Sequence, residues 1–137
     1  MPNMPTIMGL HMRYRLWIAE MNYYINLLRI LEDYLAELDP QTNSAGIKED
    51  MDGFKTRFVK LRKEIDDLRH EMHILKMILA AYAREGKAIT QETYKADNHE
   101  ALEKRFVALQ ASFNTLKEDF AGFEGKWPVN AQASYQS

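Results

Sequence analysis

The chain has 137 residues, of which 46% are hydrophobic and 28% are charged, and its formal net charge is −2. This length and composition are typical of one globular domain and exclude a largely disordered chain. The near-neutral charge gives no general attraction to nucleic acid or to an anionic membrane. The absence of cysteine excludes disulfide bonds and thiolate chemistry.

Neither a signal peptide nor a membrane span is expected. The first twelve residues lack the basic start, the apolar run and the small-residue cleavage site of a signal peptide. The most apolar stretch, 16–38, is interrupted by charged residues, so we do not expect it to cross a bilayer. We therefore expect a cytoplasmic protein.

The first predicted helix covers about residues 8–38. Two rows of apolar residues repeat every seven positions and form a seam, which is an apolar strip that packs against other helices. The seam residues are Leu10, Tyr14, Trp17, Met21, Tyr24, Leu28, Leu31, Leu35 and Leu38. Because Leu16, Tyr23 and Ile30 lie further round the helix, its apolar face is wider than one seam needs.

The second predicted helix, 45–84, has the most regular pattern in the chain. From Ile47 to Tyr82 its apolar residues alternate in steps of four and three without exception. Ser44 is placed to cap the first turn, and Gly86 suits the left-handed conformation that often closes a helix.

A third helix is predicted over 98–124, after a connection that can hold one helical turn near residues 90–94. Asp97 followed by Glu100 resembles a capping box at its start. The steps of four and three recur in Leu102, Phe106, Leu109, Phe113, Leu116, Phe120 and Phe123. We expect the indole of Trp127 to fold over the end of the helices.

Three such helices joined by reversals predict an all-α fold, an antiparallel up-down-up three-helix bundle with shallow, coiled-coil-like crossing angles. No segment shows the period of two that is typical of a β-strand. We expect residues 1–128 to form this single domain and residues 129–137 to form a flexible polar tail.

A row of basic residues lies beside the seam of the second helix. The row consists of Lys48, Lys55, Arg62, Arg69 and Lys76. Such a row could follow the phosphates of a polyanion. The favoured interpretation is that it pairs with acids on a neighbouring helix, which we expect to be the third, through Glu103 and Glu124.

His70 and His73 share a face of the second helix with Asp66, in a spacing that can chelate a divalent metal. These residues lie off the seam, whereas a metal centre in a helical bundle needs ligands that point inward. We therefore expect a solvated face with no metal and no cofactor. Because no glycine-rich phosphate loop or other catalytic motif is present, we also expect no enzymatic activity.

The clearest functional signal is an excess of apolar residues where the start of the first helix lies beside the end of the second. The expected interface consists of Met8, Leu10, Tyr14, Trp17, Ile18, Ile25, Ile74, Met77, Ile78 and Ala81. We expect self-association, with a dimer favoured. Alternatively, the N-terminal arm covers this end within one monomer, or an unknown protein partner binds it. The sequence thus predicts a non-enzymatic adaptor, scaffold or assembly protein. The alternative functions are polyanion or nucleic-acid binding along the basic row and, less favoured, metal binding by the helical bundle.

Overall fold

The computed structural model describes residues 4–127, which form four α-helices and one short 3-10 helix and contain no β-strand. The elements are α1 (Ile7–Leu38), η1 (Asp39–Gln41), α2 (Ala45–Arg84), α3 (Gln91–Ala96) and α4 (His99–Lys126). The prediction of an all-α fold is confirmed, although a fourth, short helix joins the three long ones. The predicted tail, 129–137, lies outside the described residues.

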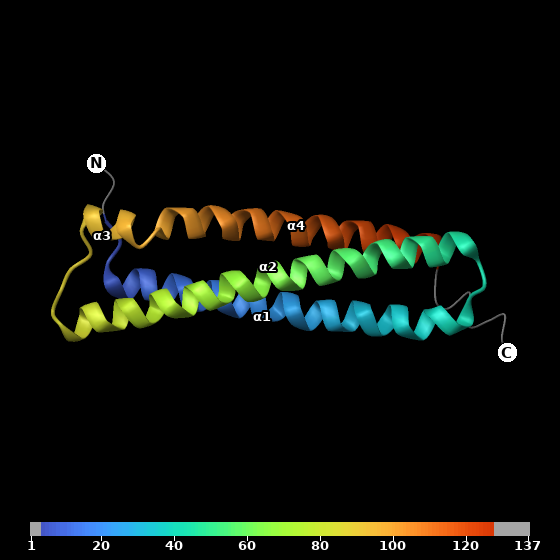
Figure 1. The fold of residues 1–137 in the computed structure, drawn as a ribbon, viewed down its shortest axis with the longest axis horizontal. Helices are drawn as coiled ribbons and strands as arrows, with labels where there is room; N and C mark the ends of the chain where they lie inside the picture. Colours follow the sequence, from blue (N-terminus) through green and yellow to red (C-terminus); the bar gives the residue numbers. More distant parts are fainter. Residues whose placement is uncertain (1–3, 128–137) are drawn as a thin grey trace.

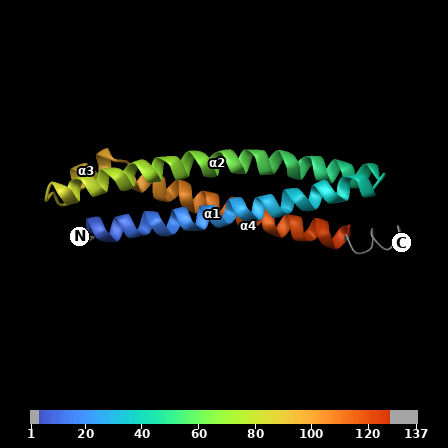
Figure 2. The same ribbon diagram turned by 90° about the horizontal axis from the view of Figure 1, so that it is seen from below.

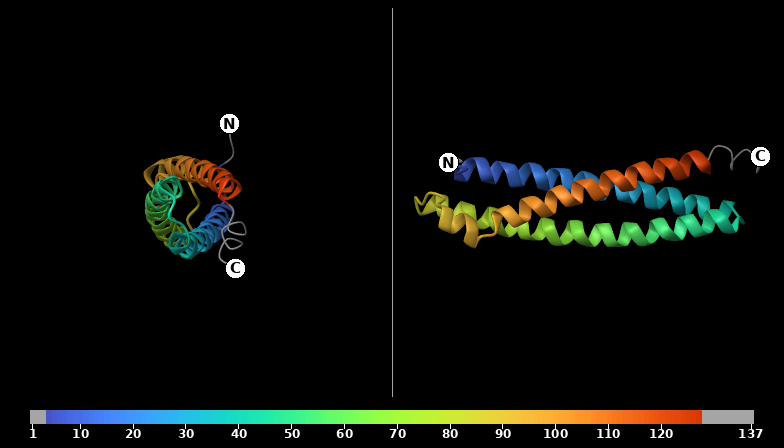
Figure 3. Two further views of the ribbon diagram at one scale, coloured as in Figure 1. Left: turned by 90° about the vertical axis from the view of Figure 1, so that its right-hand side faces the viewer. Right: turned by 90° about the horizontal axis from the view of Figure 1, so that it is seen from above.

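The three long helices lie side by side along the long axis of the molecule (Figure 1). α1 and α4 run in the same direction, and α2 runs in the opposite direction. Figure 2 gives the same arrangement from below, with α3 at the end where α1 begins and α2 ends. The end-on view in Figure 3 shows the long helices around a common centre.

Local capping explains where two of these helices begin and where α2 ends. The hydroxyl oxygen of Thr6 accepts a hydrogen bond of 2.9 Å from the backbone N–H of Gly9 and caps α1. Ser44 caps α2 as expected, since its hydroxyl accepts from the backbone N–H of Ile47 at 3.4 Å. Gly86 has a φ of 70° just after α2, which confirms its predicted left-handed conformation.

The capping box predicted at Asp97 and Glu100 is wrong. Asn98, the residue before α4, has a φ of 58°, and its side chain makes no capping hydrogen bond. The carboxylate of Asp97 instead accepts a hydrogen bond of 3.0 Å from the hydroxyl of Tyr82 on α2. Asn tolerates the left-handed conformation better than most residues, so α3 and α4 are joined by a sharp bend in place of a continuous helix.

Aromatic rings from α1 and α4 fill the space between these helices. The ring of Trp17 stacks on Phe106 with 4.9 Å between centroids, and the ring of Tyr24 stacks on Phe113 at 4.0 Å. The two contacts are separated by seven residues on both helices, which is two turns of a coiled-coil seam. The seams bury one continuous core. The backbones of α1 and α2 lie closer together than those of α1 and α4, which are separated by the aromatic rings.

Trp127 lies at the end of the molecule where α2 begins. Its Nε1 donates a hydrogen bond of 3.2 Å to Oδ2 of Asp50, and its ring packs against the core. The Nζ of Lys126 lies 5.2 Å from the ring centroid. This placement confirms that the indole folds over the end of the helices.

Candidate interaction surface and a buried polar cluster

Four residues expected at the interface are core residues of the single chain. Leu10, Tyr14, Ile18 and Ile25 are each 7% exposed or less. They present almost no surface to a partner, which corrects the expectation drawn from the sequence. The physical reason is that α1 packs against both α2 and α4, so its inward face covers a wider arc than one seam.

The other expected interface residues on α1 differ in exposure. Met8 is 80% exposed, near the first turn of the helix. Trp17 is half-buried because its indole stacks on Phe106, so it also belongs to the packed interior. Of the expected residues on α1, Met8 alone is largely free for a partner.

The expected interface residues at the apolar end of α2 also differ in exposure. Met77 is exposed, whereas Ile78 and Ala81 are half-buried. Ile74 is exposed and lines a groove of about 290 Å³ together with residues of α4, including Ala101 and Arg105. At Ile74, this part of α2 therefore borders α4.

The outward face of α1 carries a second helical strip of mostly apolar side chains. We call it the outer stripe, and it consists of Met12, Leu16, Ala19, Tyr23, Asn26 and Ile30. All six residues are exposed, and they are separated by steps of four, three, four, three and four. Steps of this kind place them in one strip along the helix, opposite the buried seam. The stripe therefore has the spacing of a coiled-coil seam, and its six residues stay exposed, although the ring of Tyr23 also lies edge-to-face against Phe113 of α4 with 6.2 Å between centroids.

Exposed large hydrophobic side chains gather on this helix. Nine such residues occur in the described part of the chain, and five of them lie on α1. The five are Met8, Met12, Leu16, Tyr23 and Ile30. Leu16 and Ile30 are 62% and 61% exposed. Scattered exposed apolar residues are normal, but a contiguous strip is typical of a protein–protein contact.

The basic row of α2 faces α1, which corrects the expectation that it faces the third long helix. Arg62 forms an ion pair with Glu32 of α1, and Arg69 donates a hydrogen bond of 2.7 Å to Asn22 of α1. Lys48 lies 3.8 Å from Asp39, just after α1. The pattern of a seam shows which face of a helix is buried but does not show on which side each neighbour lies.

The opposite flank of α2 contacts α4. Arg57 forms an ion pair of 2.9 Å with Asp119, and Glu71 forms an ion pair with Arg105. In the basic row itself, Arg62 is paired with Glu32 and Arg69 is hydrogen-bonded to Asn22. Lys55 is exposed, and Lys76 is half-buried.

His70 and His73 are exposed on α2, as expected for a solvated face. Asp66 is paired with Arg69 at 3.0 Å. Burial and the nearby charges of Lys76 and Arg69 lower the pKa of His73. Within residues 4–127, no cluster of three or more His, Cys, Asp or Glu side chains is arranged to hold a metal ion.

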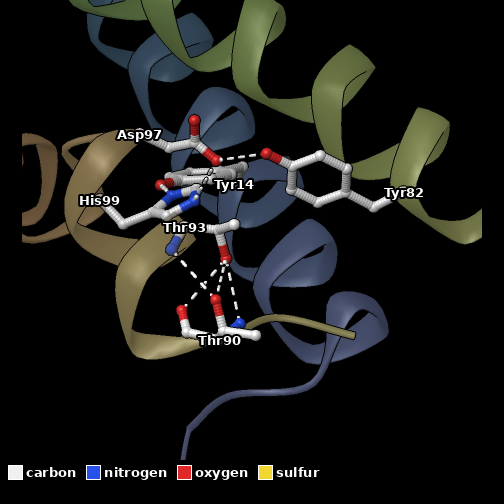
Figure 4. Close-up of polar contacts among 6 residues, drawn as sticks. All are labelled: Tyr14, Tyr82, Thr90, Thr93, Asp97 and His99. Carbon is white, nitrogen blue, oxygen red and sulfur yellow. Dashed lines mark hydrogen bonds and ion pairs between the residues drawn. The ribbon is translucent and has the colours of Figure 1, made fainter. Parts of the chain in front are cut away.

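A buried polar cluster joins three parts of the chain at the end where α1 begins (Figure 4). The hydroxyl of Tyr14 on α1 is hydrogen-bonded to Nδ1 of His99 on α4. The Nε2 of His99 lies 3.7 Å from Oδ2 of Asp97, which also accepts from the hydroxyl of Tyr82 on α2. The side chain of His99 is 2% exposed, and that of Tyr14 is 0% exposed. The cluster therefore links α1, α2 and the α3–α4 bend inside the protein.

Burial determines the protonation of this cluster. It raises the pKa of Tyr14, so the hydroxyl stays protonated and can donate to His99. Burial lowers the pKa of His99, an effect that the Arg13 charge increases and that the Asp97 charge partly opposes. A neutral His99 that accepts at Nδ1 carries its proton on Nε2, toward Asp97.

The short helix α3 holds the connection against this cluster. Thr90 and Thr93 form a reciprocal capping box, with hydrogen bonds of 3.1 Å and 3.0 Å between their hydroxyls and backbone N–H groups. The ring of Tyr94 lies over His99, with 5.1 Å between centroids. The arrangement holds the α2–α4 connection close to the start of α1.

Sequence reasoning missed this cluster. His99 and Tyr14 are 85 residues apart, and no spacing pattern relates them. The signal that could have drawn attention is the His99 position itself, three residues before Leu102 in the register of buried residues of α4. A polar residue at a seam position needs a hydrogen-bond partner from another element.

No family model, curated protein or solved structure matches this chain. Within residues 4–127, no helix combines the length and the hydrophobicity that crossing a membrane requires.

Proposed function

We propose that this protein is a non-enzymatic interaction protein that self-associates through the outer stripe of α1, with a dimer as the favoured state. In this proposal the folding unit is an antiparallel up-down-up three-helix bundle located in the cytoplasm. An adaptor, scaffold or assembly role follows, because self-association through one helix leaves the surfaces of α2 and α4 open to another partner protein.

The observation that carries the proposal is the exposure of a seam-spaced apolar strip on α1. Leu16 and Ile30 keep more than half of their surface accessible while the buried seam of the same helix is filled by α2 and α4. Leaving such a strip in water is unfavourable, at about 25 cal/mol for each Å² of apolar surface. Covering it with a second apolar strip removes this cost, and a dimer offers the simplest closed arrangement.

Size-exclusion chromatography with light scattering tests the proposal. The wild-type chain is expected to elute with a mass above that of one 16.0 kDa chain. Leu16→Asp should shift it to a monomer, because a carboxylate at the centre of an apolar contact loses its hydration. Val59→Asp is the matched control, since Val59 is 72% exposed on α2 and lies outside the stripe.

The control variant should behave as the wild-type protein does. Both substitutions replace an exposed helical residue, so both proteins should keep wild-type helicity in circular dichroism. A wild-type chain that is monomeric at tens of micromolar would contradict the proposal. Equal masses for Leu16→Asp and wild type in an associating protein would place the contact elsewhere.

A further inference from the structure

We propose that two copies of the chain pair through their outer stripes with the two α1 helices parallel and in register. This inference rests on the proposed function, because it specifies the geometry of that self-association. In this geometry Asn26 of one copy faces Asn26 of the second copy, and the two molecules lie side by side with the same ends together.

The spacing of the outer stripe identifies the kind of partner that fits it. Steps of four and three match a helix that carries the same steps, because the two strips then stay in contact along a left-handed supercoil. Within the described residues, the seams of α1, α2 and α4 that face inward are buried in the core. The outer stripe is the seam that remains exposed there, so a second copy supplies the matching surface.

Charged residues beside the stripe favour the parallel orientation. Arg15 and Arg29 lie on one flank of the stripe, and Glu20 lies on the other. In a parallel, in-register pair, each flank residue faces the residue five positions later on the other flank of the partner. Arg15 would then face Glu20 of the second copy, and Arg29 would lie beside the ring of Tyr34.

Two hydrogen bonds within the chain hold the carboxylate of Glu20. The hydroxyl of Tyr24 and the side-chain amide of Gln110 both donate to Oε2 of Glu20, at 2.8 Å and 2.7 Å. These bonds hold the carboxylate in place and leave Oε1 to accept from Arg15 of the second copy. The carboxylate is thus fixed before association, which reduces the entropy lost on pairing.

The antiparallel orientation that covers the whole stripe brings like charges together. Residues of the same flank then face each other, so Arg15 would lie opposite Arg29, and Glu20 opposite Glu20 of the second copy. Asn26 would face Leu16, which leaves a polar amide buried without a hydrogen-bond partner. In the parallel pair the two Asn26 side chains lie opposite each other, so each amide can bond to the other.

Disulfide cross-linking of single-cysteine variants distinguishes the two orientations. The natural chain has no cysteine, so an introduced thiol has no competing partner. Met12→Cys and Ile30→Cys place thiols 18 positions apart along α1, which is about 27 Å on a helix. A disulfide needs Cα atoms within about 7 Å of each other, so it reports direct apposition.

The parallel pair predicts that each variant alone forms a disulfide-linked dimer under mild oxidation. A mixture of both variants should then give no link between residues 12 and 30. Val107→Cys, on the exposed face of α4, is the control and should stay unlinked. Links that form only in the mixture, or no links in a protein that is dimeric by light scattering, would overturn the parallel pairing but not self-association. A monomeric wild-type protein would instead overturn the proposed function itself.

Charge reversal at Arg15 gives a second, non-covalent measurement. In the parallel pair, Arg15→Glu places two carboxylates together and should raise the dimer Kd several-fold. The double variant Arg15→Glu/Glu20→Arg restores the opposite charges and should recover most of the affinity. A lower Kd for Arg15→Glu would contradict the parallel pairing, because it is the antiparallel pair that brings position 15 close to Arg29.

Discussion

The hydroxyl of Tyr14 is hydrogen-bonded to Nδ1 of His99, which follows 85 residues later in the chain, and both side chains are buried. This bond ties the start of α1 to the start of α4. Asp97 extends the contact to Tyr82 at the end of α2. The cluster thus fixes one end of the protein, while Trp127 and Asp50 fix the other end.

Removal of the Tyr14 hydroxyl should destabilise the protein. Tyr14→Phe keeps the ring in the core but leaves Nδ1 of His99 buried without its partner. The expected loss in the free energy of unfolding is about 1–3 kcal/mol, measured by urea denaturation. Tyr24→Phe, which removes a hydroxyl bonded to the half-buried Glu20, should cost less. An unchanged midpoint for Tyr14→Phe would mean that the bond contributes nothing to stability.

Stability should fall as the pH is lowered, and His99 should cause part of this fall. The unfolded chain takes up a proton near the ordinary histidine pKa of 6.5, whereas burial keeps the pKa of folded His99 lower. The stabilisation is therefore fully present above pH 6.5 and decreases below it, because protons then favour the unfolded chain.

A matched variant isolates this histidine. His99→Gln should lose less stability than the wild type between about pH 7 and about pH 5, measured as the difference in free energy of unfolding. His73 also has a lowered pKa, but it is present in both proteins and cancels from the comparison. Identical pH profiles would show that His99 does not titrate differently on folding.

The pair between Arg62 and Glu32 should contribute to stability, and not to binding of polyanions. Arg62→Glu should lower the free energy of unfolding by about 1 kcal/mol or less, since both side chains are more than a third exposed. The swapped variant Arg62→Glu/Glu32→Arg should recover most of this loss. If Arg62→Glu instead weakens retention on heparin without a change in stability, the basic row acts as a polyanion site.

Trp127 should stabilise the end where α2 begins. Trp127→Ala removes a half-buried indole and its bond to Asp50, so the free energy of unfolding should fall by about 1–3 kcal/mol. Trp127→Phe keeps part of the packing and should lose less. A wild-type melting temperature for Trp127→Ala would show that the indole does not contribute to the packed end.

The periodicity of the sequence predicted the helices well. The regular steps from Ile47 to Tyr82 coincide with the buried face of α2, and the ends of α1 and α2 lie where Ser44, Gly86 and the proline after Asp39 place them. These features depend on local chemistry and on one repeated spacing, which a sequence displays directly.

The periodicity of the sequence could not predict on which side of each helix the neighbouring helices lie. The basic row faces α1 because of the hand in which the three long helices are arranged, and both hands bury the same seams. The same limit applies to Leu10 and Tyr14, which the apolar excess placed at the expected interface but which are buried in the core. The contact between Tyr14 and His99 depends on the whole fold, so no local pattern predicts it.

Sedimentation equilibrium of the wild-type chain tests self-association through α1 most directly, together with Leu16→Asp and Val59→Asp. The account predicts that the wild type and Val59→Asp approach twice the 16.0 kDa mass of one chain as concentration rises, while Leu16→Asp stays at the mass of one chain. A wild-type mass that remains at that of one chain over the whole concentration range would contradict it.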